Sequence, residues 1–184
     1  MLYKVSETFH SLQGEGYWSG TPSFFIRLAG CNLDCPWCDT DHQRRESLTI
    51  PALFARAEKE SPRCKRLVLT GGEPTLQTIQ PLIDYFRERG WYVAVETNGT
   101  GGRPSADWVT VSPKAGVDYP EDLSGDEIKI VFDGKSDPGR FLHCAFKHWY
   151  IQPCSQDFEP AVRYVLEHPP WRLSVQLQHV LRIR

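Results

Sequence analysis

The sequence predicts an α/β fold, a partial and open (β/α)6-like barrel of the TIM type, formed by a single domain over residues 1–184. Three observations lead to this prediction. Apolar segments typical of strands alternate with segments of helical periodicity, which favours a mainly parallel sheet with right-handed crossovers. The chain has 184 residues, whereas a complete eight-fold barrel takes roughly 250, so about six strands are expected. Polar segments rich in Gly and Pro follow five of these strands, on the side where such folds carry their sites.

The expected strands are short runs of Val, Ile, Leu, Phe, Trp and Tyr. Thr49 and Asp157 precede helices expected near residues 50–60 and 158–168, where their side-chain oxygens can cap the first turn. The apolar residues of both kinds of element are expected to form the core. The strands are expected at residues 24–28, 66–70, 91–96, 107–111, 127–132 and 148–152. Helical spacing is found at Ile79, Leu82, Ile83 and Phe86 and at Phe158, Val162, Val165 and Leu166.

The composition is ordinary for a globular protein, with 40% hydrophobic and 24% charged residues. A formal net charge of −2 gives no sequence-independent attraction to nucleic acid or anionic membrane, so neither is expected as a partner. No window is apolar over the length of a transmembrane span, and the N-terminus lacks a signal-peptide core. We therefore expect a cytoplasmic location.

The strongest signal is a group of three cysteines, Cys31, Cys35 and Cys38, with three and two residues between them. Thiolates are the usual ligands of iron–sulfur clusters, and a loop this short can wrap one [4Fe-4S] cluster. Three ligands leave the fourth iron open, so it can bind the amino and carboxylate groups of S-adenosylmethionine (SAM). Electron transfer from the cluster into the SAM sulfonium then releases a 5′-deoxyadenosyl radical.

Two other interpretations of this loop remain. A zinc site would need a fourth ligand, for which Asp39, Asp41, His42 and Cys64 are candidates. A dithiol redox motif would use only the two cysteines at thioredoxin-like spacing and leave the third surplus. Zinc usually takes its cysteines as two separated pairs, so the cluster is favoured. Of the other cysteines, Cys64, Cys144 and Cys154 are expected to be buried and structural, with Cys154 worth attention because it adjoins a polar loop.

Four further polar segments follow expected strands, at residues 70–74, 96–100, 112–114 and 152–153. The carboxyl ends of parallel strands lie at one end of the sheet, so these segments are expected to meet there with the cysteine loop. Turn chemistry alone rarely produces this coincidence.

With these residues in place, the chain resembles the radical SAM enzymes and, among them, the 7-carboxy-7-deazaguanine synthases, over almost its whole length. The cysteine triplet and the Gly71-Gly72-Glu73-Pro74 segment mark the superfamily. The narrower resemblance rests on Gln13-Gly14-Glu15-Gly16, the surroundings of Arg27, Cys38-Asp39-Thr40, Ser112-Pro113-Lys114 and the C-terminal Leu-Ser-Val-Gln segment.

The resemblance implies a lyase of 7-deazapurine (queuosine) biosynthesis. Its reaction would convert 6-carboxy-5,6,7,8-tetrahydropterin to 7-carboxy-7-deazaguanine by radical ring contraction with loss of ammonia. It further implies that SAM is regenerated in each turnover, that Mg2+ is required, that the protein is a homodimer, and that a flavodoxin or ferredoxin supplies electrons.

The resemblance also assigns roles to residues. Thr40 would bind Mg2+ through its hydroxyl oxygen, and the three cysteines of the triplet would hold the cluster. SAM would be bound by Trp37, Cys38, Asp39, Gly72, Glu73, Ser112, Pro113, Lys114, Gln152, Pro153, Cys154 and Ser155. The pterin would be bound by Leu12, Gln13, Gly14, Arg27, Thr70 and the terminal carboxylate of Arg184, with Glu15 and Gln178 as further pocket residues. Arg27 would pair with the substrate carboxylate in two-pronged geometry.

Simpler interpretations exist for single residues. Gly71 and Gly72 can form a tight turn, Arg27 a surface ion pair, Thr40 a helix cap, and Lys114 a solvated side chain. Their joint occurrence in order beside the cysteines favours the functional interpretation. The chain also departs from the family, because Gln178 stands where a substrate-contacting histidine is common and His179 where a lysine is common.

Two other function classes fit parts of the sequence. A small radical SAM activase would generate a glycyl radical on a partner protein, but it has no evident use for the Arg27 and Thr40 sites. An iron–sulfur electron carrier or a zinc-stabilised binding module would have a closed four-ligand site and no affinity for SAM.

Overall fold

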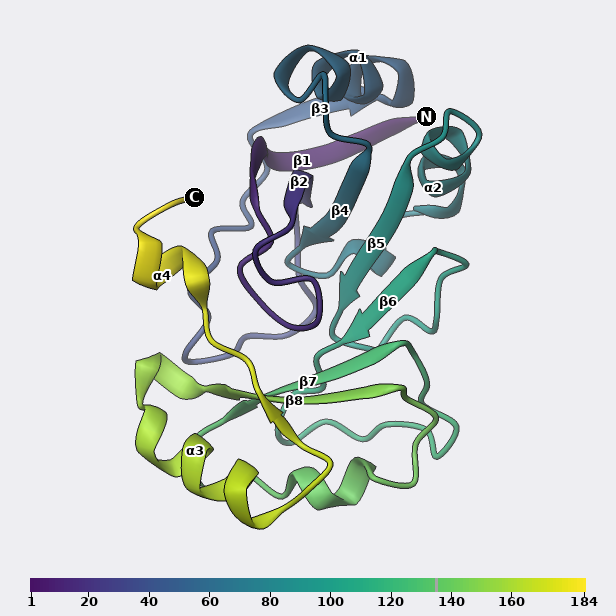
Figure 1. The fold of residues 1–184 in the computed structure, drawn as a ribbon. Coiled ribbons are helices and arrows are strands. Elements are labelled where there is room, and N and C mark those ends of the chain that lie inside the picture. Colours follow the sequence, from purple (N-terminus) through teal and green to yellow (C-terminus); the bar gives the residue numbers. More distant parts are fainter. Residues whose placement is uncertain (135) are drawn as a thin grey trace.

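The computed structural model of the protein describes residues 1–134 and 136–184. One sheet of nine strands has the order β3-β1-β2-β4-β5-β6-β7-β8-β9. The strands run parallel from β2 to β9, whereas β1 pairs antiparallel with both β2 and β3. The sheet curves without closing, and the C-terminal segment lies beside the opening (Figure 1). The predicted fold, a partial and open barrel, is therefore confirmed.

The six predicted strands are all present. They are β2 (Pro22–Leu28), β4 (Arg66–Gly71), β5 (Tyr92–Thr97), β6 (Trp108–Val111), β7 (Glu127–Phe132) and β8 (His148–Pro153). Three strands were not predicted, namely β1 (Leu2–Leu12), β3 (Glu46–Thr49) and β9 (Arg172–Leu173). Their sequences contain many polar residues, because each lies toward an edge of the sheet or faces the cavity described below. An edge strand buries too little surface to require a continuous apolar run.

Three main helices cover the convex face of the sheet (Figure 1). They are α1 (Ile50–Glu60), α2 (Gln80–Arg87) and α3 (Phe158–Glu167). The apolar residues of α1 and α2 pack on the outward side chains of β2, β4 and β5, whereas α3 packs on β7 and β8. A short unpredicted helix, α4 (Leu177–Leu181), ends the chain and contributes no buried residue.

The capping predictions had different outcomes. The Thr49 hydroxyl accepts a hydrogen bond from the Ala52 backbone N–H at 3.4 Å, as predicted for the start of α1. Asp157 occupies the N-cap position of α3, as predicted, but its side chain makes no capping hydrogen bond.

The repeat of strand and helix is incomplete. Residues 98–107, between β5 and β6, and residues 112–126, between β6 and β7, form no helix. Pro104, Pro113 and Pro120 interrupt these stretches, and proline disfavours a helix by fixing φ and removing a backbone donor. The expectation of one domain stays a prediction, supported by the single sheet that joins both ends of the chain. No helix in the described part of the chain is long and apolar enough to cross a bilayer.

Candidate active site

A cavity of about 930 Å³ opens at the carboxyl ends of the parallel strands. All five predicted loops contribute to its lining, together with the loop that joins β1 to β2 and the C-terminal segment. The coincidence of polar loops in the sequence therefore corresponds to one concave site, of a size that fits small-molecule ligands.

The cavity gathers nearly all of the predicted site residues. The predicted residues that line it are Leu12, Gln13, Gly14, Glu15, Arg27, Cys31, Cys35, Trp37, Cys38, Asp39, Thr40, Thr70, Gly72, Ser112, Lys114, Gln152, Pro153, Cys154, Ser155, Gln178 and Arg184. Two predicted residues do not line it, Glu73 and Pro113, and both are buried.

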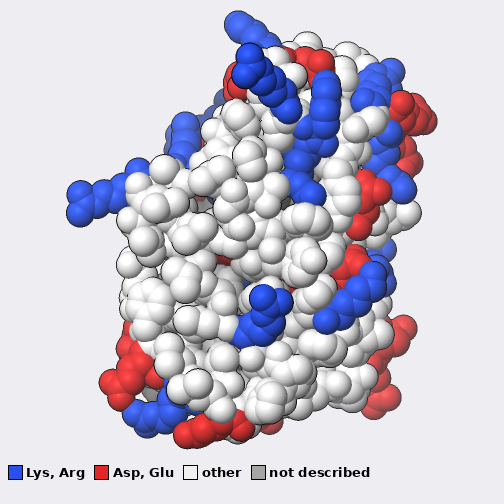
Figure 2. Space-filling view, in the orientation of Figure 1, with Lys and Arg blue, Asp and Glu red and all other residues white. Residues whose placement is uncertain are grey.

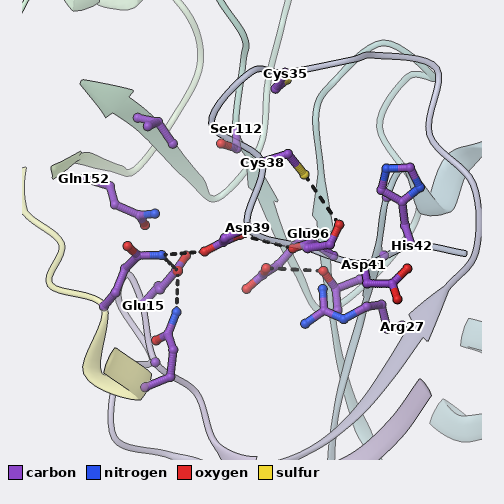
Figure 3. Close-up of a pocket in the computed structure, with 18 of the residues that line it drawn as sticks. Glu15, Arg27, Cys35, Cys38, Asp39, Asp41, His42, Glu96, Ser112 and Gln152 are labelled. Atoms are coloured by element: carbon purple, nitrogen blue, oxygen red, sulfur yellow. Dashed lines mark hydrogen bonds between the residues drawn. The ribbon is translucent and has the colours of Figure 1, made fainter. Parts of the chain in front are cut away.

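The cysteine loop lies at one end of this cavity, and Figure 3 shows Cys35 and Cys38 on it. The backbone N–H of Cys38 donates to the Cys35 carbonyl at 3.0 Å, which turns the loop, and the Cys38 thiol lies 3.7 Å from the Thr40 carbonyl. Among the described residues, no three His, Cys, Asp or Glu side chains converge closely enough to hold a metal ion. The three thiols thus share one loop and one cavity, but they do not form a ligand cage by themselves.

Gly72 lets the loop that follows β4 approach the cysteine loop. A Cβ atom at this position would lie 2.2 Å from the Gly30 carbonyl oxygen and 2.8 Å from the Cβ of Cys31. Only a residue without a side chain permits this contact. The neighbouring Glu73 backbone N–H donates to the same carbonyl at 2.8 Å. The predicted tight turn and the predicted cofactor site therefore coincide here.

The surroundings of the Cys35 thiol raise its pKa, although one cation lies beside it. Burial raises the pKa of the Cys35 thiol; the Lys114 ammonium opposes this, and the neighbouring Cys38 and Cys31 raise it further. The donor set fits a [4Fe-4S] cluster, because three soft sulfur ligands face one cavity with a cation beside them.

Lys114 is held inside the site rather than in solvent. Its Nζ atom donates to the Ser112 hydroxyl at 2.7 Å and lies 5.3 Å from the centroid of the Trp37 ring. Burial lowers the pKa of Lys114, and the charge of Lys129 lowers it further, while the Cys35 thiol acts in the opposite direction. The interpretation of Lys114 as a solvated surface residue is therefore wrong.

Glu73 is fully buried and has its acceptors filled by the protein. Its carboxylate accepts four hydrogen bonds, from the backbone and hydroxyl of Thr75, the hydroxyl of Thr97 and the backbone of Asn98, at 2.6–2.9 Å. These bonds tie the loop after β4 to the loop after β5. In this structure Glu73 orders the walls of the cavity and does not face it.

Arg27 projects from β2 into the cavity, directly across the strand pair from Glu7 on β1. Its Nε atom donates to Glu7 Oε1 at 2.8 Å, and its side chain is 20% exposed. The ion pair that the simpler interpretation expected does exist, but it lies in the site and not on the outer surface. Figure 3 shows Arg27 on the opposite side of the cavity from Gln152.

An ion pair that the sequence did not predict lies deeper in the barrel. Lys129 on β7 donates from Nζ to Glu15 Oε2, and the side-chain amides of Gln176 and Gln178 both donate to Glu15 Oε1, at 2.8 and 2.9 Å. Burial alone would raise the pKa of Glu15, but Lys129 and the two amides lower it to about 2. Burial lowers the pKa of Lys129, but the charges of Glu15 and Glu96 outweigh burial and raise this pKa above its usual value. Both groups are therefore charged at neutral pH.

Two carboxylates below this pair complete the interior. Glu96 on β5 accepts from the Gln13 amide at 2.7 Å and from the Thr70 hydroxyl at 3.5 Å, so it links two predicted substrate residues. Glu127 on β7 is 2% exposed and accepts from the Tyr17 backbone N–H at 2.8 Å. Burial raises the pKa of Glu127 to about 7, since Lys129 and the Tyr17 N–H only partly offset it.

The sequence context of Lys129 is similar to that of Arg27. A charged residue inside an apolar strand segment drew attention to Arg27, and Lys129 stands in the same position within residues 127–132. Glu7 and Gln176 gave no such signal, because polar residues surround them and only the fold brings them to the cavity.

Two buried amide oxygens in the cavity lack a hydrogen-bond donor among the described residues, Oε1 of Gln152 and Oε1 of Gln178. An unpartnered buried acceptor is costly, so each is an expected contact for a bound ligand. Oε1 of Gln178 lies so close to Gly14 that a Cβ there would be 1.8 Å away.

The remaining predictions on this site concern Thr40 and the scattered cysteines. The Thr40 hydroxyl donates to Asp39 Oδ1 at 3.2 Å in a segment without a helix, so the helix-cap interpretation is wrong. Cys64 and Cys144 are buried as predicted, at 8% and 7% exposure, whereas Cys154 lines the cavity.

Comparison with known proteins gave consistent findings. The family model of the Radical SAM superfamily matches residues 25–121. A protein of Bacteroides thetaiotaomicron named 7-carboxy-7-deazaguanine synthase is 44% identical over 186 residues, covering 100% of each chain. One of the same name from Nitratidesulfovibrio vulgaris is 39% identical over 217 residues, again covering 100% of each. A solved structure described as QueE from Escherichia coli has a TM-score of 0.78 and 27% identity, over 96% of this chain and 95% of that one.

Proposed function

The chain belongs to the radical SAM superfamily and, within it, to the 7-carboxy-7-deazaguanine synthases, and we propose that its cavity binds 6-carboxy-5,6,7,8-tetrahydropterin. The enzyme is a lyase that forms 7-carboxy-7-deazaguanine, a step toward queuosine and related 7-deazapurines. The pterin ring contracts and ammonia is lost, so that substrate and products balance without net oxidation. One observation carries the proposal: the three-cysteine loop and the guanidinium of Arg27 line the same cavity.

Cys31, Cys35 and Cys38 would hold the cluster, next to the part of the cavity that would bind SAM. When bound, the cluster and SAM supply a 5′-deoxyadenosyl radical through one-electron cleavage of the sulfonium. Lys114 attracts the SAM carboxylate from its position beside Ser112 and Trp37. The close backbone approach at Gly72, the residues Asp39 and Gln152 to Ser155, and the unpartnered Oε1 of Gln152 complete the SAM site.

Arg27 binds the substrate carboxylate. Among the described residues, hydrogen bonds and ion pairs engage only its Nε atom, so the two terminal nitrogens are free for a two-pronged contact. A guanidinium matches a carboxylate in this geometry, and the radical chemistry then takes place on a ring held at one fixed end.

The other end of the pterin carries N–H donors that need acceptors. Leu12, Gln13, Gly14 and Thr70 line this end of the cavity, and Gln178 supplies an unpartnered buried Oε1. The Gln178 amide is oriented by its donation to Glu15, which leaves the oxygen for the ligand. Gln178 thereby substitutes for the histidine common in the family, accepting a hydrogen bond in a fixed direction.

Thr40 would provide a hydroxyl oxygen for Mg2+. Small hard cations take oxygen ligands and often keep several waters. Thr40 lines the cavity beside Asp39, whose carboxylate lies 3.7 Å from His179 Nε2, its one ion-pair partner among the described residues.

The proposal includes partners other than the substrate, which the family and the exposed surface support. A flavodoxin or ferredoxin supplies the electron, and the protein acts in the cytoplasm as a homodimer. Charged residues are sparse in the middle of the face in Figure 2, and Val180, Leu181 and Ile183 of the C-terminal segment are exposed. Exposed apolar side chains of this kind are common at subunit contacts.

An anaerobic assay tests the proposed function. Reconstituted protein is mixed with SAM, Mg2+, a strong reductant and 6-carboxy-tetrahydropterin, and the products are identified by mass spectrometry. We expect 7-carboxy-7-deazaguanine and ammonia, with both lost in Cys35→Ala, which also loses cluster iron. SAM cleavage without this product would overturn the substrate proposal. A glycyl radical on a partner protein, without turnover of the pterin, would favour an activase instead.

A further inference from the structure

The carboxylate of Glu7 is shared between two arginines from opposite ends of the chain. Its Oε1 atom accepts from Arg27 Nε at 2.8 Å, and its Oε2 atom accepts from the guanidinium of Arg184, the last residue. All three residues line the cavity. The arginine that contacts the substrate carboxylate is therefore linked to the C-terminus through one side chain.

A β-bulge in β1 turns Glu7 into the cavity. Val5 pairs with Leu28, but Glu7 pairs with Arg27, so one extra residue is inserted between Val5 and Glu7. Before the bulge, Val5 points toward the helix layer and is fully buried there. A one-residue shift exchanges the two faces of a strand, so the residues at positions 7, 9 and 11 point to the other side.

These three residues of β1 are the ones that contact Arg184. Glu7 forms the ion pair, the ring of Phe9 lies 5.4 Å from the Arg184 guanidinium, and the Ser11 hydroxyl donates to the terminal oxygen of Arg184. Phe9 also stacks on Phe25 of β2, with 4.7 Å between ring centroids. An ion pair, a cation–π contact and a hydrogen bond thus join Arg184 to β1.

The helix at the C-terminal end has no fully buried side chain that would fix it without these contacts. Helix α4 buries no residue, and its Val180 and Leu181 are exposed. Its other end is attached by the amides of Gln176 and Gln178 on Glu15 and by the Leu177 N–H on the Gly14 carbonyl at 2.9 Å. Polar contacts at both ends therefore decide how the segment lies across the cavity.

We propose that Glu7 is a positioning residue that orients Arg27 for the substrate carboxylate, and that the Arg184 side chain holds Glu7 in place. Arg27 presents its terminal nitrogens to the ligand because Glu7 binds the Nε edge. Arg184 binds the other oxygen of the Glu7 carboxylate. The position of the C-terminal segment and the orientation of Arg27 are therefore coupled through Glu7. This inference rests on the proposed role of Arg27.

The test compares two ligands that differ only in the carboxylate. Binding of 7-carboxy-7-deazaguanine and of 7-deazaguanine to the anaerobic, cluster-containing protein with SAM is measured by calorimetry. For Glu7→Gln we expect roughly tenfold weaker binding of the carboxylated ligand and less than about twofold change for the other. For Arg184→Gln, which keeps the terminal carboxylate, we expect about two- to fivefold weaker binding of the carboxylated ligand.

Two features make the outcome decisive. If Glu7 had no positioning role, removing its negative charge beside an anionic ligand would strengthen binding by Coulomb's law. Tighter or unchanged binding of the carboxylated ligand by Glu7→Gln therefore overturns the inference. In Glu7→Gln/Arg184→Gln the losses should be less than additive, because both act through one carboxylate. Additive losses would also overturn it.

Controls separate this inference from the proposed function. Arg182→Gln, in the same exposed segment and without an ion pair among the described residues, should bind both ligands like the parent protein. Equal parental binding of the two ligands would contradict the role of Arg27 itself. A parental preference for the carboxylated ligand that survives in Glu7→Gln would leave Arg27 intact and reject only the role of Glu7.

Discussion

The Nζ atom of Lys129 and the Oε2 atom of Glu15 form an ion pair inside the barrel, between β7 and the loop that joins β1 to β2. The two side chains are only 6% and 15% exposed. The pair fixes the loop between β1 and β2 against the barrel wall and supplies the cation that offsets the neighbouring carboxylates of Glu96 and Glu127.

Removing one member of this pair should destabilise the protein strongly. In Lys129→Met, the carboxylates of Glu15, Glu96 and Glu127 lose a neighbouring cation, and we expect the free energy of unfolding to fall by about 3–5 kcal/mol. The double variant Glu15→Gln/Lys129→Met should lose less than the sum of the single variants, because no uncompensated partner remains. Urea denaturation at pH 7 measures these values. A loss below about 1 kcal/mol in Lys129→Met would contradict a buried pair.

Glu127 should make the protein less stable as the pH rises. Its pKa is raised from 4.5 in the unfolded chain to about 7 in the folded protein. Below pH 4.5 the folded and unfolded states both hold the proton, and the stabilising contribution of Glu127 is fully present. Between pH 4.5 and about 7 only the folded state holds the proton, so the free energy of unfolding falls until the pH has passed the folded pKa of about 7. The loss amounts to about 3 kcal/mol.

Glu127→Gln should remove that dependence. The amide oxygen can still accept from the Tyr17 N–H but cannot lose a proton. Between pH 5 and pH 8, we expect the free energy of unfolding of the parent protein to fall by about 2–3 kcal/mol more than that of the variant. Urea denaturation at both pH values measures this difference. Parallel pH profiles for the two proteins would refute the assignment of the shift to Glu127.

Arg27→Lys tests whether geometry or charge binds the substrate. Lysine keeps the positive charge but cannot make a two-pronged contact, nor reach Glu7 and the ligand at once. We expect the KM for the carboxylated pterin to rise by about tenfold or more, with a smaller effect on kcat. Steady-state kinetics give both constants. A parental KM in Arg27→Lys would mean that charge alone suffices.

Gly14→Ala should disrupt the pterin end of the cavity. The added Cβ would lie 1.8 Å from Gln178 Oε1 and 2.8 Å from its Cδ, so the amide must move away from Glu15. We expect at least tenfold weaker binding of 7-carboxy-7-deazaguanine, since a buried hydrogen bond and close packing are both lost. In Gly14→Ala/Gln178→Ala the clash is relieved, so thermal stability should recover while affinity stays low. Recovery of full affinity would reject the acceptor role of Gln178.

How much could be predicted from the sequence differs between elements. The six parallel strands were predictable because central strands are buried on both faces and require continuous apolar runs. The strand β1 was not, since the bulge before Glu7 and the cavity beside it leave one face polar. The gaps in the helix layer after β5 and β6 also escaped prediction, although the prolines there provide the physical reason.

The sequence by itself determined the chemistry: three thiols at cluster spacing, an arginine within an apolar strand, and polar loops after the parallel strands. Each is a local property, because ligand spacing and strand periodicity are written within a few consecutive residues. Only the tertiary structure decided that Glu73 faces inward to bind Thr75, Thr97 and Asn98, and that Lys129 pairs with Glu15. It also decided that Glu7 lies between Arg27 and Arg184. Apart from the local Glu73–Thr75 bond, these contacts join residues that are 20 to 177 positions apart. No local pattern specifies which distant side chain a buried charge will meet.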